Sequence, residues 1–361
     1  MEGSPIDIVI FAPLAPILGV LLFWFIQLLF IESQKYLIEK IRPKHEPLCR
    51  FTNFLGVLYQ SICHALGYTL TKSGISDFYI SVNYGRVSPK KEKKGIFEWI
   101  SNAFLFMGPF FIPAVLIILY LFLLGFKGFE TIIPAQVLYL KYTFGGQLTT
   151  YGVNLYNFTN NFLNFLVNLN LLHPGHFGFL LLLIFLGLGI RPSHIGEKKV
   201  DRVNMIYDLK NIWKLITHKP IYIILLFSVT YLFFYISLLL GQIWYIIFFS
   251  FLGWLSIISI VALFITHMIL YLIKTTDEII GRKKYLLYII IPLSYILARI
   301  FFHYIKADFD LSTSLFIMIL STILVLYLSK RKKKEKKTQK FKTKIDIKSL
   351  EKIDEGETDE R

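Results

Sequence analysis

The segment Leu58–Tyr68 holds the residues whose spacing comes nearest to a known chemistry. It reads LYQSICHALGY and contains Cys63, one of two cysteines in the chain, and His64, one of eight histidines. A hydrolytic zinc helix needs the pattern His-Glu-x-x-His. Two imidazoles four residues apart then share one helix face and bind the metal, while the glutamate activates a zinc-bound water as general base. Only part of that pattern is present here.

The motif can be aligned in two registers, and each lacks the same two functions. In the first register Gln60 and His64 occupy the ligand positions and Ser61 occupies the base position. In the second register His64 and Tyr68 are at the ligand positions and Ala65 is at the base position. Neither Ser61 nor Ala65 is a carboxylate, and Gln60 and Tyr68 are weak zinc ligands. We therefore expect no catalytic residue in this segment, no resident cofactor, and zinc only as a candidate ligand of His64.

The features around this segment follow an order that resembles the site-2 protease family of intramembrane zinc metalloproteases. Small and apolar residues follow the motif at 65–68, which favours the first register. A β-prone stretch at 78–87 lies where that family has a membrane-associated hairpin. The sequence SNAFLFMGP at 101–109 is similar to the Ala-Gly-Pro stretch of its next helix. The sequences RPS at 191–193 and DLKN at 208–211 are similar to its Pro-Ser and Asp-Leu elements.

The resemblance covers residues 50 to 215. It implies the position of a zinc site and also that two residues of that site have been replaced. It implies Asp208 as the distant third zinc ligand beside His64, although an insert separates Asp208 from the Pro-Ser element. The replaced base and the replaced ligand imply a pseudoprotease that binds membrane-protein clients or partners without cleaving them. Two other interpretations stay open: an active metalloprotease with a rearranged site that uses His64, Asp208 and His194, and a helix bundle in which His64 is an ordinary polar residue.

The composition predicts the elements that position these residues. The chain has 361 residues, of which 55% are hydrophobic and 17% charged, whereas a soluble domain has about 25% charged residues. Several apolar runs approach the ~20 residues that cross a bilayer as a helix. We predict an all-α polytopic membrane protein with seven or eight transmembrane helices and a short β-hairpin after the second apolar segment. The runs are 8–31, 51–71, 96–122, 176–190, 220–240, 243–273, 285–305 and 312–328.

The second run, Phe51–Thr71, makes the count uncertain by one. It is polar for a lipid-facing helix, and a full crossing would place five Lys and Arg residues of the preceding connector outside the membrane. We favour a re-entrant or enclosed helix. The first run lacks a basic start and a small-residue cleavage site, so we expect a retained span and not a secretory signal.

The apolar runs, the resemblance over residues 50–215 and the charge pattern together predict four regions, and the charge pattern predicts their sidedness. These are an N-terminal span and charged connector (1–50), a site-2-protease-like core (51–215), a C-terminal bundle of four transmembrane helices (216–329), and a disordered, basic-then-acidic tail (330–361). The net charge of +15 lies mainly in loops between apolar runs. The expected location is the cell membrane with a cytoplasmic C-terminal tail. The expected partner of the lysines is the lipid bilayer and not nucleic acid.

Other polar residues within apolar segments suggest a second class of function. Five asparagines, spaced by three and four residues, form one stripe on a helix: Asn154, Asn157, Asn161, Asn164 and Asn168. The stripe predicts either an interfacial helix with its amides in water or the wall of a polar groove. Arg299 lies inside a span and must snorkel, bind a carbonyl or line a polar cavity. A transporter, channel or lipid-handling protein is therefore the alternative function.

Overall fold

The structure is a computed structural model that describes residues 4–82, 84–126, 142–190, 205–279, 283–305 and 309–328. It divides into two compact units, residues 1–270 and 271–361. Helix α8 (Trp244–Asp277) begins in the first unit and ends in the second, and the predicted division into four regions stays a prediction. The expected tail at 330–361 lies outside the described residues.

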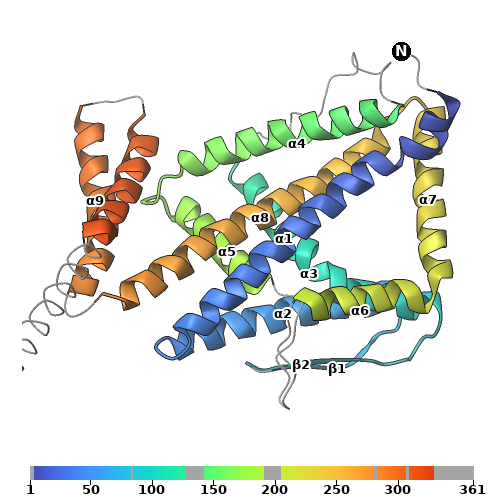
Figure 1. Ribbon diagram of the computed structural model, residues 1–361, viewed down its shortest axis with the longest axis horizontal. Coiled ribbons are helices and arrows are strands. Elements are labelled where there is room, and N and C mark those ends of the chain that lie inside the picture. Colours follow the sequence, from blue (N-terminus) through green and yellow to red (C-terminus); the bar gives the residue numbers. More distant parts are fainter. Residues whose placement is uncertain are drawn as a thin grey trace, which may run out of the picture. The chain divides into compact units, whose positions relative to one another are not determined.

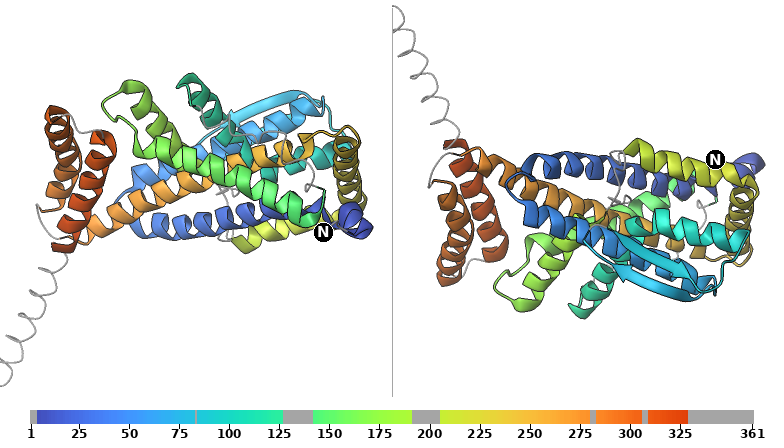
Figure 2. Two further views of the ribbon diagram at one scale, coloured as in Figure 1. Left: turned by 90° about the horizontal axis from the view of Figure 1, so that it is seen from above. Right: turned by 90° about the horizontal axis from the view of Figure 1, so that it is seen from below.

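Unit 1 is a helical assembly with one small antiparallel sheet (Figures 1 and 2). The sheet pairs Phe78 with Val87 and Ile80 with Gly85, as the predicted hairpin requires. The elements are η1 (Asp7–Phe11), α1 (Leu14–Ile41), α2 (Glu46–Leu70), β1 (Ile75–Ile80), β2 (Gly85–Pro89), α3 (Ile96–Leu123), α4 (Phe144–Val167), α5 (Pro174–Gly189), α6 (Met205–His218), α7 (Pro220–Leu239) and α8 (Trp244–Asp277).

Among the described residues, six helices are long and apolar enough to cross a membrane. They are Asp7–Ile41, Ile96–Leu123, Pro220–Leu239, Trp244–Asp277, Tyr285–Tyr304 and Asp310–Leu328. The multi-span helical class is thus supported, while the predicted count of seven or eight is not confirmed. The other two predicted runs also form helices: α2 is too polar to qualify, and α5 is too short.

Helix boundaries follow simple local rules. Proline occupies the first turn of α2, α5 and α7, where a missing N–H costs nothing. The expected charged connector after the first span is mostly helical, because α1 continues to Ile41 and α2 begins at Glu46. Charged residues such as Lys35 and Glu39 are good helix formers, so the end of the apolar run does not end the helix.

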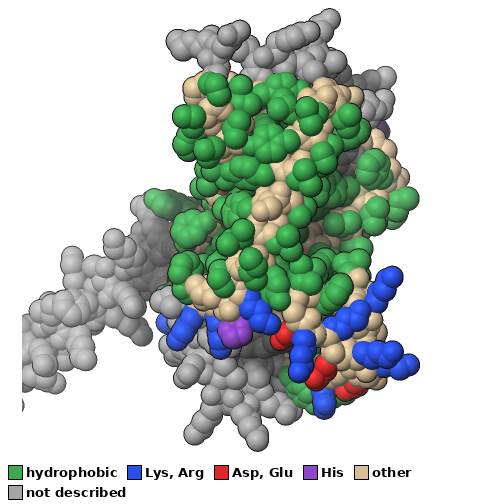
Figure 3. Space-filling model, turned by 90° about the vertical axis from the view of Figure 1, so that its right-hand side faces the viewer, with side chains coloured by type: hydrophobic (Ala, Val, Ile, Leu, Met, Phe, Trp, Pro, Cys, Tyr) green, Lys and Arg blue, Asp and Glu red, His purple; other side chains and the backbone are tan. Residues whose placement is uncertain are grey.

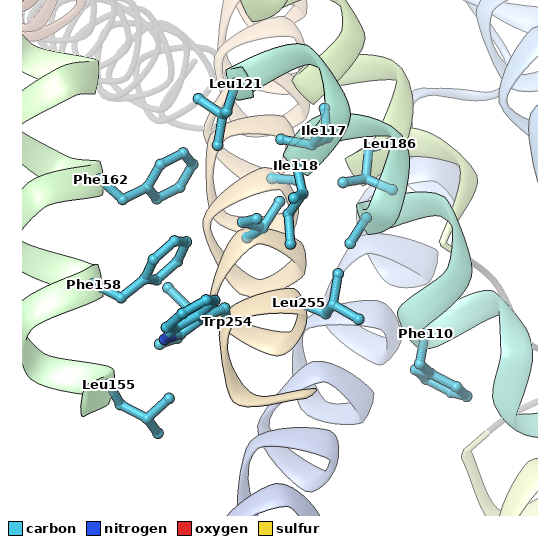
Figure 4. Packing of buried hydrophobic residues seen from close by; sticks show 14 of the residues in the cluster. Phe110, Ile117, Ile118, Leu121, Leu155, Phe158, Phe162, Leu186, Trp254 and Leu255 are labelled. Carbon is cyan, nitrogen blue, oxygen red and sulfur yellow. The ribbon is translucent and has the colours of Figure 1, made fainter. Parts of the chain in front are cut away.

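The core of unit 1 lies where α3, α4, α5 and α8 meet (Figure 4). The Phe158 ring of α4 stacks on Trp254 of α8 with centroids 5.1 Å apart, and on Phe162 at 5.8 Å. A Cβ built on Gly187 of α5 would lie 2.2 Å from the Ala262 carbonyl oxygen of α8. Only glycine allows this approach of two helix backbones.

Unit 2 contains the end of α8, α9 (Lys283–Tyr304) and the helix Asp310–Leu328. Arg299 of α9 donates a hydrogen bond to Asp310 and forms an ion pair with it. Ser321 also donates to Ser294, with 3.0 Å between the oxygens. Arg299 therefore meets a carboxylate, a partner that the expected alternatives of snorkelling, carbonyl binding or a polar cavity did not name.

Candidate functional site

The degenerate motif lies on α2, which packs against α3, α5 and both strands of the hairpin. In the first register, the positions of the missing ligand and the missing base are both inside the protein: Gln60 is 2% exposed and Ser61 is 3% exposed. Asn53, two turns earlier, is also buried and donates from Nδ2 to the Val82 carbonyl oxygen of the hairpin. One polar face of α2 is thus covered by the hairpin.

The start of β2 lies directly on the base position. A Cβ built on Gly85 would be 2.2 Å from Ser61 Oγ and 2.9 Å from Val57 Cγ1. Real Cβ atoms do not approach other heavy atoms so closely, so the backbone of β2 fills the space beyond Ser61. A general base and its water need that space. The arrangement around Ser61 is therefore a packed interface between a helix and a strand.

His64 lies one helical turn after Gln60 and is less buried than Gln60 and Ser61. Its ring is half-buried and its centroid is 4.4 Å from that of Tyr68, one helical turn later. The two ligand positions of the second register therefore share one face of α2, as their i,i+4 spacing requires. A tyrosine ring beside an imidazole, with Ala65 between them in sequence, offers no carboxylate for water activation.

The segment SNAFLFMGP, which carries part of the resemblance, packs on the motif helix. A Cβ on Gly67 would lie 3.1 Å from Ser101 Cα, and a Cβ on Gly108 would lie 2.9 Å from Cys63 Cβ. Cys63 is fully buried in this contact, and both cysteines of the chain are free thiols. Small residues thus bring α2 and α3 close together, and Cys63 has a packing role here.

Within the ranges that the structure describes, no three His, Cys, Asp or Glu side chains gather as a metal site would require. Asp208 is in α6, but its side chain lies outside the described residues, as do the Pro-Ser element and His194. The predicted zinc ligation by His64 and Asp208 therefore stays a prediction.

The asparagine stripe runs along α4 from the interior to the surface. Asn154 is 3% exposed and its Nδ2 donates to Ser250 Oγ of α8 at 3.0 Å. Asn157 and Asn161 are half-buried, whereas Asn164 and Asn168 are exposed, and Asn168 Nδ2 donates to the Asn164 carbonyl oxygen. Asn154, the first asparagine of the stripe, thus joins α4 to α8.

Two histidines, His173 and His176, lie close together at the start of α5. Their ring centroids are 4.9 Å apart, and His176 Nδ1 accepts a hydrogen bond from the Asn170 backbone N–H at 3.0 Å. His176 Nδ1 is thus used by the turn between α4 and α5.

A cavity of about 370 Å³ between α3 and the end of α6 was not predicted. Residues 191–219 lie between two predicted apolar runs and were expected to be a basic loop. The sequence does carry a helical period in this segment. Apolar residues recur at three- and four-residue spacing at 209, 212, 215 and 216, with Lys210 and Lys214 between them and His218 after them. That period predicts an amphipathic helix with a basic face.

Comparison of the chain with protein-family models, with curated proteins and with solved structures finds no match.

Proposed function

We propose that this protein is a non-catalytic, site-2-protease-like membrane protein that binds segments of other membrane proteins. The proposal rests on the ordered resemblance of residues 50–215 and on the two replaced positions of the motif. It requires no zinc and no hydrolysis. Substitution of Gln and Ser for a ligand and the base removes water activation and most of the metal affinity.

The observation that supports the proposal most is the contact between Gly85 and Ser61. A Cβ on Gly85 would lie 2.2 Å from Ser61 Oγ, so the base position has no free volume above it. In an active site this volume holds water and the scissile bond. Here the same volume holds the backbone of β2, which favours a binding role for the hairpin over a chemical role for α2.

The hairpin offers an edge to which a client can bind. The sheet has two strands, so each strand has one outer edge without a further strand among the described residues. All of β1 except Ile80 is exposed, including Ile75, Phe78 and Tyr79 at 39%, 48% and 48%. An extended peptide adds to such an edge through backbone hydrogen bonds, and apolar side chains beside the edge give specificity.

A photocrosslinking experiment tests this role. A photoreactive amino acid replaces Tyr79 of β1 in the full-length protein, which is then reconstituted in nanodiscs with single-span peptides that carry an extended juxtamembrane segment. The matched control places the same group at Tyr156 of α4, which is 69% exposed. We expect crosslinks at position 79 that an unlabelled peptide competes away, and none at position 156.

The peptides are also followed for cleavage. Intact peptides together with crosslinks at position 79 support the proposal. Equal labelling at positions 79 and 156 would show non-specific contact within the bilayer. Cleavage that depends on His64 would replace the proposal with the rearranged-protease interpretation.

A further inference from the structure

The cavity near the α3 N-terminus has a basic lining. Lys214 and His218 come from α6 and Lys219 from the junction with α7, while Glu98 is the one acidic residue of the lining. Glu98 Oε2 lies 3.9 Å from Lys219 Nζ, a separation at which an exposed pair gains little. The cavity therefore keeps a positive potential, which favours an anionic ligand.

The Trp99 side chain links α3 to α6 and to α7 beside the cavity. Trp99 of α3 donates from Nε1 to the Leu215 carbonyl oxygen of α6 at 3.1 Å. The Trp99 ring centroid is 6.1 Å from that of Tyr222 in α7, and Lys219 Nζ lies 5.8 Å from the Tyr222 centroid. Trp and Tyr side chains are enriched where hydrocarbon meets headgroups. This arrangement is typical of the membrane–water interface.

The N-terminus of α3 adds to the preference for an anion. Gly95 is the N-cap residue of this 28-residue helix, makes no side-chain cap and lines the cavity. The amide groups of a first helical turn carry partial positive charge and bind phosphate in many proteins. The two lysines and this helix end therefore belong to the same cavity.

An apolar surface begins where the basic lining ends. Pro220 starts α7 directly after Lys219, and Ile221, Ile224 and Leu225 are 63%, 59% and 45% exposed. Only 11% of the most apolar stretch of α7 is buried within the protein. Figure 3 shows this side of the molecule, with hydrophobic side chains above and Lys and Arg gathered at the lower end. An acyl chain can pack against this apolar surface, whereas a soluble anion makes no apolar contacts there.

We propose that the cavity between α3 and the end of α6 binds the headgroup phosphate of an anionic phospholipid, whose acyl chains lie along the neighbouring helix α7. Lys214 and Lys219 pair with the phosphate, His218 and Asn102 offer polar contacts, and Tyr222 lies at the level of the glycerol backbone. This site is separate from the hairpin and does not depend on client binding.

Native mass spectrometry of the full-length protein, released from nanodiscs with equal amounts of phosphatidylglycerol and phosphatidylcholine, tests the site. We expect retention of phosphatidylglycerol by the wild-type protein. The double variant Lys214→Gln/Lys219→Gln should retain roughly 30-fold less, because each lysine beside an anionic headgroup contributes about 1 kcal/mol, a factor of about five. The matched control is Lys210→Gln, an exposed α6 lysine that does not line the cavity.

A second variant separates the cavity from the general charge of the surface. Asn102→Phe fills the cavity, leaves the charge unchanged and should also reduce phosphatidylglycerol retention. Equal losses in Lys210→Gln and the double variant would overturn the proposal in favour of diffuse attraction. Displacement of the lipid by millimolar inorganic phosphate would overturn it in favour of a soluble phosphate ligand. Retention of phosphatidylcholine at the same level as phosphatidylglycerol would also contradict it.

Discussion

Among the buried polar side chains of unit 1, two groups are covered by different kinds of structure. Between helices, Asn154 binds Ser250, and Gln34 Nε2 donates to the Leu263 carbonyl oxygen at 3.0 Å and to Thr266 Oγ1. On α2, by contrast, Asn53 and Ser61 lie under the backbone of a two-stranded hairpin. The first kind of cover is a long helix of the core. The second is a short element with an open edge.

The difference separates structural polarity from polarity that can serve binding. Polar groups paired between core helices are exposed only when the whole unit unfolds. Groups under a hairpin are exposed when the hairpin alone moves, which costs less than global unfolding. The α2–hairpin interface is therefore the better candidate for function, although the α4–α8 interface carries the more regular sequence pattern.

The largest effect is expected at the helix–helix interface. Gly187→Ala places a methyl group 2.2 Å from the backbone oxygen of Ala262. Because backbone cannot move aside as a side chain does, we expect a loss of about 1–3 kcal/mol or failure to fold. The midpoint of denaturant unfolding in detergent measures it. Gly152→Ala of α4 is the control, since nothing lies within 4 Å of its added Cβ. An unchanged unfolding midpoint in Gly187→Ala would contradict the close approach of α5 and α8.

Gly85→Ala should act on the hairpin and leave the core intact. Its methyl group would meet Ser61 Oγ and Val57 Cγ1, so the hairpin must move away from α2. With Ser61→Cys as reporter, we expect maleimide labelling at position 61 to rise about tenfold, as a cost of 1–3 kcal/mol at this contact implies. Labelling of the protein without the Ser61→Cys change, in which Cys49 and Cys63 are both buried, gives the background. Unchanged labelling would show that the hairpin does not cover Ser61.

Restoring the missing motif residues should not restore chemistry. In Gln60→His/Ser61→Glu the glutamate has no volume beneath Gly85, so we expect displacement of the hairpin, little bound zinc and no peptide cleavage. Gln60→His alone is the control for the histidine. Stoichiometric zinc with cleavage in the double variant would show that the hairpin leaves the base position open.

The smallest effect is expected for the asparagine stripe. Asn154→Ala should cost about 0.6–1.5 kcal/mol, the usual contribution of a hydrogen bond between membrane helices. A double-mutant cycle with Ser250→Ala isolates the pair. Asn164→Ala, at an exposed position of the same stripe, should be near neutral. If Asn164→Ala costs as much as Asn154→Ala, the stripe has partners beyond the α4–α8 contact.

The sequence predicted features that depend on local pattern. The apolar runs became helices, and the β-prone stretch became the β1–β2 hairpin. Contacts between distant segments were out of reach. Nothing in the order of residues places Gly85 on Ser61, or Asp310 beside Arg299, since both depend on how two elements dock. The cavity beside Trp99 was missed for a related reason: its walls come from segments over a hundred residues apart.

The zinc content of the purified protein tests the central claim most directly. The full-length protein is isolated without chelator after expression in zinc-supplemented medium, and metal per chain is measured by mass spectrometry for wild type and His64→Ala. The proposed non-catalytic role predicts far less than one zinc per chain in both proteins, with no difference between them. One zinc per wild-type chain that is lost in His64→Ala would contradict it.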